Sequence, residues 1–124
     1  MYIYYNPNPL NKSTGDCVIR ALAKALNTTW YDIFLELMAL AFEQCDMPSS
    51  NYIWNEYLLR NGFKCYMLTD ACPYCYTVSQ FAEDHPYGIY ILGTGLHAVT
   101  IKDGNYYDAW DSGNEVPIYY FEKE

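Results

Sequence analysis

The chain has 124 residues, 52% of them hydrophobic, and a net charge of −8 from 7 Lys and Arg against 15 Asp and Glu. This length is enough for one hydrophobic core and predicts a single domain over residues 1–124. Nucleic-acid phosphates and anionic membranes are bound through Lys and Arg, so the acidic charge argues against both as partners. The N-terminus does not have the pattern of a signal peptide, and no apolar run is long enough to span a bilayer. We therefore expect a cytoplasmic protein with its five cysteines reduced.

The first part of the chain predicts two helices after an irregular start. Residues 1–10 contain two prolines and are expected to be extended or looped. Apolar residues recur at the spacing of an amphipathic helix over residues 17–26. Thr29, with an acid three residues later, predicts the start of a second helix that stops before Pro48. This second segment is so apolar that we expect it to be the core helix.

Shorter elements are predicted in the middle of the chain. Ser49 or Ser50 is expected to cap a third helix, which Gly62 ends. Residues 63–68 are typical of a short strand, and residues 77–86 of a brief helix that stops at a proline.

The pattern changes to that of strands after Pro86. Asp103-Gly104 favours a tight hairpin turn, because both residues tolerate positive φ. Helices followed by strands predict an α+β fold, with N-terminal helices packed on a C-terminal antiparallel β-sheet. The strand-like runs are 88–95, 97–102, 105–110 and 116–121.

Cys17 is the first candidate for chemistry, because it opens a predicted helix. The backbone dipole and the free N–H groups at a helix N-terminus both favour the thiolate, which is the reactive form of cysteine. The same N–H groups can stabilise an oxyanion when the thiolate attacks a carbonyl.

His97 is the second candidate, and the hairpin turn decides which acid accompanies it. With a two-residue loop at 103–104, paired positions sum to 207, which brings Asp108 beside His97 on one face. A one-residue bulge would instead place Asp111 opposite His97. We favour Asp108 as the acid that orients the imidazole, with Asp111 as the alternative.

These local motifs resemble those of the papain-like cysteine peptidase superfamily. Asn11 lies six positions before Cys17, where papain relatives place the Gln of the oxyanion hole. The whole chain resembles a family of short uncharacterised proteins from bacteriophages and gut Firmicutes with GDCVIRA and YYDxWDSG motifs. The superfamily motifs match segments 15–17, 97–99 and 108–110, and those of the short family match 6–9, 15–21, 85–92, 97–99 and 106–113.

The resemblance implies a minimal papain-like fold and acyl transfer without a cofactor. Cys17 would be the nucleophile, His97 the base and Asp108 the acid that orients it. Asn11 and the Cys17 amide would bind the oxyanion, and Trp110 would shield the His97–Asp108 contact from water. The substrate would be a protein or peptide. The alternative is a catalytically silent papain-fold protein of phage origin that binds a host protein, in which case it would act in the host cytoplasm.

Other cysteines permit two rival sites. Cys72-Pro73-Tyr74-Cys75 matches a glutaredoxin-type dithiol motif, although no thioredoxin-like order of elements surrounds it. Cys65, Cys72 and Cys75 are three potential zinc ligands, with Cys45 or His85 as the fourth, although only one close Cys-x-x-Cys pair is present. We expect neither, and we expect Arg20 to pair with Asp16 or Glu56 rather than with a substrate.

Overall fold

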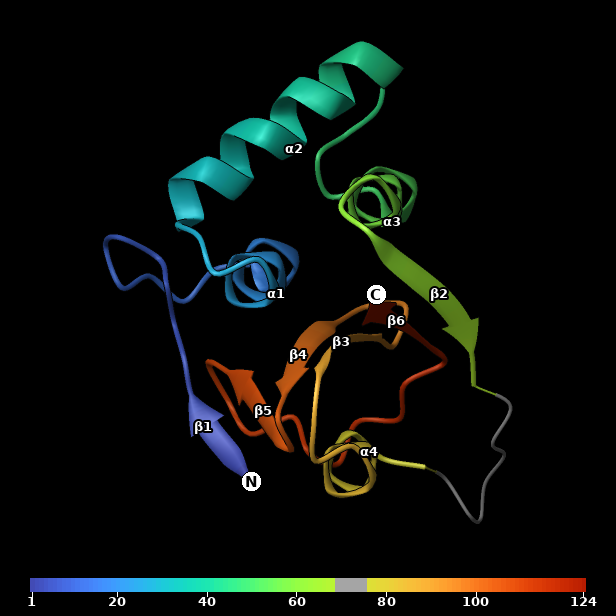
Figure 1. Ribbon diagram of the computed structural model, residues 1–124. Coiled ribbons are helices and arrows are strands. Elements are labelled where there is room, and N and C mark those ends of the chain that lie inside the picture. Colours follow the sequence, from blue (N-terminus) through green and yellow to red (C-terminus); the bar gives the residue numbers. More distant parts are fainter. Residues whose placement is uncertain (69–75) are drawn as a thin grey trace.

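The computed structural model describes residues 1–68 and 76–124 (Figure 1). It has an α+β fold, in which the helices lie mostly in the first half of the chain and a six-stranded mixed sheet is formed mostly by the second half. The helices are α1 (Cys17–Ala25), α2 (Trp30–Gln44), α3 (Asn51–Arg60) and α4 (Val78–Asp84). The strands are β1 (Tyr2–Tyr4), β2 (Phe63–Met67), β3 (Ile89–Gly93), β4 (Ala98–Lys102), β5 (Asn105–Asp108) and β6 (Tyr119–Lys123).

Several local predictions are confirmed by the helix ends. The side chain of Thr29 caps α2 by accepting from the Asp32 N–H, and Ser50 caps α3. Thr77 and Gln80 form a reciprocal capping box at α4. These signals act over two or three residues, so they are readable without the tertiary structure.

The sheet follows the order β1-β5-β4-β3-β6-β2. Strands β3, β4 and β5 form the predicted antiparallel meander, and the β4–β5 pairs sum to 207, which confirms the two-residue turn at Asp103-Gly104. The expectation of an antiparallel C-terminal sheet is confirmed in part, because all strand pairs except β1–β5 are antiparallel and the sheet as a whole is mixed. Strand β6 pairs with β3 instead of extending the meander beyond β5, whose free edge is taken by β1 in parallel. Residues 2–4, expected to be extended or looped, thus form a strand of the sheet.

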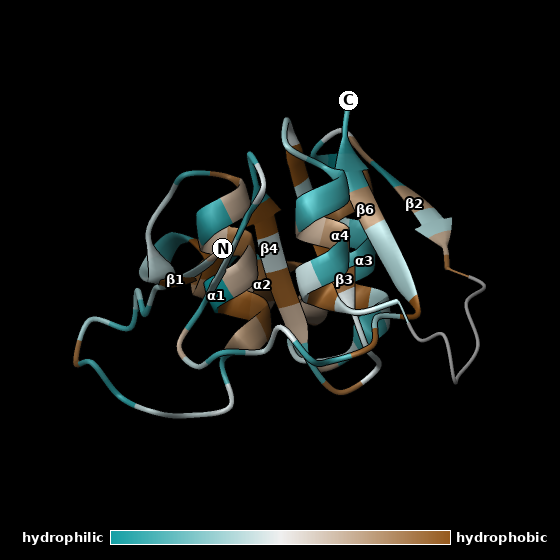
Figure 2. Ribbon diagram, turned by 90° about the horizontal axis from the view of Figure 1, so that it is seen from below, coloured by the Kyte–Doolittle hydropathy of each residue, from teal (hydrophilic) through white to brown (hydrophobic). Residues whose placement is uncertain are grey.

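Helices cover both faces of the sheet, as Figure 1 shows. Helices α1, α2 and α3 pack on one face and α4 on the other, and each face has its own core. Residues of β4 alternate between these cores: Ala98 belongs to the first, and Val99 and Ile101 to the second. Burial on both faces explains why β4 is largely apolar along its length (Figure 2).

Helix α1 lies directly on the middle of the sheet, against β3, β4 and β5, whereas α2 packs on α1 and α3 (Figure 1). Its small residues Ala21, Ala23 and Ala25 are buried, and the Ala21 carbonyl accepts a buried bond of 2.6 Å from Thr100 Oγ1 of β4. The prediction that the second helix is a core helix holds for one face, which contributes Ile33, Leu37, Leu40 and Ala41 to the core, whereas much of the remaining apolar surface of α2 is exposed. Across the described ranges, no helix is long and apolar enough to cross a membrane.

Candidate active site

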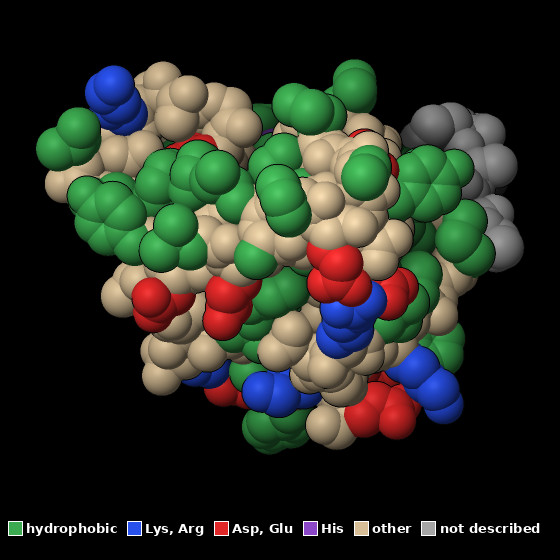
Figure 3. All heavy atoms as spheres, turned by 90° about the horizontal axis from the view of Figure 1, so that it is seen from above, with side chains coloured by type: hydrophobic (Ala, Val, Ile, Leu, Met, Phe, Trp, Pro, Cys, Tyr) green, Lys and Arg blue, Asp and Glu red, His purple; other side chains and the backbone are tan. Residues whose placement is uncertain are grey.

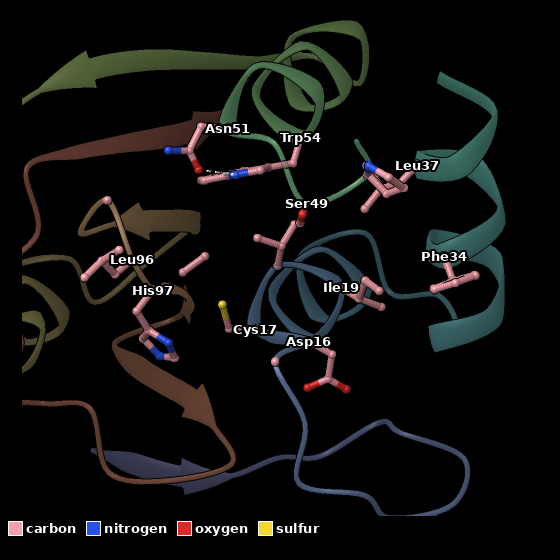
Figure 4. Close-up of a pocket in the computed structure, with 15 residues that line it drawn as sticks. Asp16, Cys17, Ile19, Phe34, Leu37, Ser49, Asn51, Trp54, Leu96 and His97 are labelled. Atoms are coloured by element: carbon pink, nitrogen blue, oxygen red, sulfur yellow. Dashed lines mark hydrogen bonds between the residues drawn. The ribbon is translucent and has the colours of Figure 1, made fainter. Parts of the chain in front are cut away.

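The fold brings Cys17, His97 and Asp108 together from three elements. Cys17 is the first residue of α1, His97 directly precedes β4, and Asp108 is the last residue of β5. The β4–β5 register places Asp108 beside His97, and the packing of α1 on β4 brings the thiol to the imidazole. Figure 4 shows the sulfur of Cys17 between α1 and the ring of His97.

His97 is hydrogen-bonded to both partners. Its Nε2 lies 2.6 Å from Asp108 Oδ2, which leaves Nδ1 as the ring nitrogen that faces the Cys17 thiol. Burial alone would lower the pKa of His97, but the hydrogen bonds and charges of Asp108 and Cys17 raise it to about 9. The imidazole is therefore protonated at neutral pH.

The pKa of the Cys17 thiol is shifted in the opposite direction, downward. Burial raises its pKa, but the hydrogen bond with His97, a backbone hydrogen bond from Ala98 and the charges of His97 and Arg20 outweigh that effect. The net pKa of Cys17 lies below its ordinary value, which favours a thiolate–imidazolium pair.

Asp108 is held by four donors and is almost completely buried. Its Oδ2 accepts from His97 and from Ser112 Oγ, each at 2.6 Å, and its Oδ1 accepts from the Ala109 N–H and from Arg20. Burial raises the pKa of Asp108, but these donors and the nearby charges bring it below the usual range. The acid is thus ionised and fixed in one orientation.

Arg20 joins this acid to the start of α1. Its Nη2 lies 2.9 Å from Asp108 Oδ1 and its Nη1 lies 2.9 Å from Asp16 Oδ1, with the side chain only 6% exposed. The predicted pairing with Asp16 is confirmed, whereas Glu56 pairs with Arg60. The bond to Asp108 was not expected, because the two residues lie 88 positions apart in the chain.

Asp16 precedes Cys17 but does not cap α1 with its side chain. Its carboxylate instead accepts from Arg20, from Trp30 Nε1 at 2.9 Å and from Asn8 Nδ2 at 3.4 Å. The N–H groups in the first turn of α1 are therefore not covered by this carboxylate, which would otherwise compete with an incoming oxyanion.

The other predicted site residues have different environments. The ring of Trp110 packs on the ring of His97, with centroids 4.9 Å apart. Asp111 accepts from Tyr106 and from the Gly113 N–H, so it is Asp108 and not Asp111 that binds His97. Asn11 lies in an exposed turn with a φ of 54°. Its side chain accepts from Asn6 Nδ2, and Asn11 is not among the described residues that line the pocket at Cys17.

A cavity of about 470 Å³ opens beside the thiol. Apolar side chains from α1, α2 and α3 line it, with Leu96 and His97 across from α2 (Figure 4). Among the described residues that line it, the one acid is Asp16, which is buried and already bonded to Arg20. The apolar lining residues are Val18, Ile19, Phe34, Leu37, Pro48, Trp54, Leu96 and Ala98.

The rival cysteine sites gain no support from the part of the chain that the structure describes. Cys65 is exposed on β2, and Cys72 and Cys75 lie outside the described residues, as does the dithiol motif that contains them. Within residues 1–68 and 76–124, no group of three or more His, Cys, Asp or Glu side chains is placed to hold a metal ion.

Two supporting residues were missed by sequence reasoning. Ser112 is buried and donates to Asp108, and Trp30 donates to Asp16 from the start of α2. Ser112 lies in the YYDAWDSG segment that carries the family resemblance, so that motif was an available signal. Trp30 has no comparable signal, because its role depends on how α2 packs against α1.

Comparison of the chain with protein-family models, with curated proteins and with solved structures found no match in any of the three.

Proposed function

We propose that the protein is a thiol hydrolase of the papain-like type, a cysteine peptidase, isopeptidase or amidase, that acts through an acyl-enzyme. The observation that carries the proposal is the bonded series from Cys17 through His97 to Asp108, with Cys17 at a helix N-terminus and beside a cavity. The order of these residues along the chain, and a Cys-bearing helix packed on a mostly antiparallel sheet, support a minimal papain-like fold.

The first half-reaction forms a thioester. The Cys17 thiolate attacks the carbonyl carbon of the substrate, and the oxyanion accepts hydrogen bonds from N–H groups in the first turn of α1. The proton on His97 Nδ1 passes to the leaving amine as the C–N bond breaks. Asp108 keeps its hydrogen bond to Nε2 and holds the ring in place throughout.

The second half-reaction releases the acid. His97 takes a proton from water, the hydroxide adds to the thioester carbonyl, and the C–S bond breaks. The products are a carboxylic acid and the Cys17 thiolate, again paired with protonated His97. Because the cavity is apolar, we expect the acyl part of the substrate to carry a bulky apolar side chain. Asn11 as oxyanion donor requires its loop to rearrange, since Asn11 is not among the described residues that line the pocket at Cys17.

The test is acylation of Cys17 by p-nitrophenyl esters of N-acetylated amino acids. We expect a burst of nitrophenol and one acyl group on Cys17 by mass spectrometry, faster with an ester of phenylalanine than with one of aspartate. The variant Cys17→Ala should lose the burst, and Cys65→Ser, which removes an exposed thiol, should retain it. Acylation of Cys17 no faster than that of Cys65 would refute the proposal.

The second candidate, a catalytically silent protein that binds a host protein, is favoured by one observation. Helix α2 exposes several large apolar side chains on a face that no other described element covers. A binding role does not exclude hydrolysis, and the acylation assay decides whether Cys17 is active.

A further inference from the structure

The outer face of α2 carries a continuous apolar stripe, formed by Tyr31, Leu35, Met38 and Phe42. These side chains are 59%, 62%, 44% and 88% exposed. At 100° per residue the four positions fall within about 60° of one another around the helix, and they span about 17 Å along it. They form what we call the α2 stripe. Figure 3 looks down on this side of the molecule and shows hydrophobic side chains gathered there, with acidic side chains beside them.

The α2 stripe is separate from the face that holds α2 in the fold. The buried residues of α2 are Ile33, Leu37 and Leu40, which lie on the opposite side of the helix, and Ala41, which lies about 90° from the centre of the stripe. A helix needs only one apolar face to pack on its own domain. A second apolar face exposed to water is typical of a surface that binds another molecule.

The spacing of the α2 stripe indicates the shape of its partner. Its residues are separated by four, three and four positions, which is the alternation of the a and d positions in a heptad repeat. Side chains at this spacing form a straight seam that receives the apolar seam of a second helix, with the axes crossing at about 20°. The small residue Ala39, exposed beside the stripe, permits close approach of that helix.

Charge distinguishes among the possible partners. Helix α2 has three carboxylates, Asp32, Glu36 and Glu43, on one flank of the stripe, and it contains no Lys, Arg or His. Two of them have weak or local partners, since Asp32 accepts from Thr28 and Glu43 lies 3.8 Å from Arg60. A second copy of this chain would add another acidic flank and another charge of −8. An anionic membrane would repel the same flank, because helices that bind such surfaces are rich in Lys and Arg.

We infer that the α2 stripe docks an amphipathic helix of a partner protein, whose apolar seam is flanked by Lys or Arg. The apolar seam supplies the buried area and the basic flank pairs with the acidic side of α2. This docking does not depend on the chemistry of Cys17, so it stands or falls separately from the proposed hydrolase activity.

The test uses a synthetic helix of three heptads, with Leu at positions a and d and Lys at e and g. Repulsion between its lysines keeps this peptide from pairing with itself. Binding to the full chain is measured by fluorescence anisotropy, with a peptide that carries Glu at e and g and a Lys peptide of scrambled order as controls. We expect saturable binding of the Lys peptide, at least tenfold tighter than that of either control.

Variants separate the α2 stripe from the net charge of the protein. Leu35→Gln with Phe42→Gln keeps the charge, and we expect it to weaken binding of the Lys peptide at least tenfold. Tyr87→Gln, at a residue 82% exposed elsewhere on the surface, and Cys17→Ala are expected to bind as the wild type does. Circular dichroism checks the fold, and Phe42→Gln alone, at the most exposed position, serves if the double variant unfolds.

Three results would overturn the inference. The first is no saturable binding of the Lys peptide. The second is equal binding by the wild type and the Leu35→Gln, Phe42→Gln variant, which would reduce the interaction to charge attraction. The third is a dimer of the wild type that this variant abolishes, because it would assign the α2 stripe to a second copy of the chain.

Discussion

Replacing His97 with alanine is expected to raise the pKa of Cys17 and slow its alkylation at neutral pH. Burial raises the pKa of this thiol, and the hydrogen bond and charge of His97 are the main groups that lower it again. Without them the thiol returns toward its ordinary pKa of 9.0, at which about 1% is thiolate at pH 7. A fully ionised thiol that returned to a pKa of 9.0 would lose about a hundredfold of its reactive fraction at pH 7.

Part of the resulting loss in alkylation rate is offset, because a more basic thiolate is a better nucleophile. Its intrinsic rate rises about threefold for each unit of pKa, so the net loss in alkylation rate at pH 7 is smaller than the loss in thiolate fraction. The difference should shrink as the pH rises and vanish near pH 9, where the thiol of the variant ionises as well.

The assay is the rate of iodoacetamide alkylation from pH 5 to 9, with each cysteine resolved by peptide mass spectrometry. The exposed thiols Cys45 and Cys65 serve as references within the same molecule, and their rates should not change. His85→Ala, at the other histidine of the chain, is the matched control. Equal Cys17 profiles in the wild type and His97→Ala would refute the ion pair and the proposed mechanism with it.

Three further predictions concern the charges around His97. Arg20→Met removes the cation between two buried carboxylates, Asp16 and Asp108, and should lower the free energy of unfolding in urea by about 3 to 5 kcal/mol. Arg60→Met, at an exposed pair, should cost less than about 1 kcal/mol, and equal losses for the two variants would contradict the buried network. Asp108→Asn should lower the pKa of His97 from about 9 toward 6.5, which NMR titration of the imidazole measures. A pKa that stays near 9 would show that Asp108 does not stabilise the protonated imidazole. In Cys17→Ala, Asp108 still raises the pKa of folded His97 above 6.5, so folded His97 keeps a proton that the unfolded chain loses, and stability should fall as the pH rises above 6.5. In the wild type, folded Cys17 has lost a proton that the unfolded chain keeps over the same pH range, and this offsets the proton that folded His97 keeps. The stability of the wild type should therefore stay nearly constant with pH. Equal slopes of stability against pH for the two proteins in urea unfolding would count against the ion pair.

Features set by a few neighbouring residues could be predicted from the sequence. The caps at Thr29, Ser50 and Thr77 are examples, because each rests on a side chain that bonds a backbone N–H two or three residues away. The turn at Asp103-Gly104 is another. Positive φ at both residues establishes the 207 register, and with it the side-by-side placement of His97 and Asp108.

Tertiary structure decided what depends on a choice between distant partners. The sequence of β6 suits a strand beside β5 or beside β3, and the choice follows from β1 occupying the free edge of β5. The apolar pattern of α2 cannot say which of its two apolar faces is buried, since α1 covers only one. Arg20 reaches Asp108 across 88 positions because α1 packs on the sheet next to β5.

In the candidate site, too, some features follow from the sequence and others only from the tertiary structure. The sequence by itself pointed to Cys17, His97 and Asp108, because a helix start and a hairpin register are local and each restricts where its side chain can lie. Only the tertiary structure brought the thiol to the imidazole and buried Arg20 between two acids, and it placed the Asn11 side chain on Asn6. Those contacts depend on how whole elements pack, since burial and charge pairing are properties of the assembled core and not of any short segment.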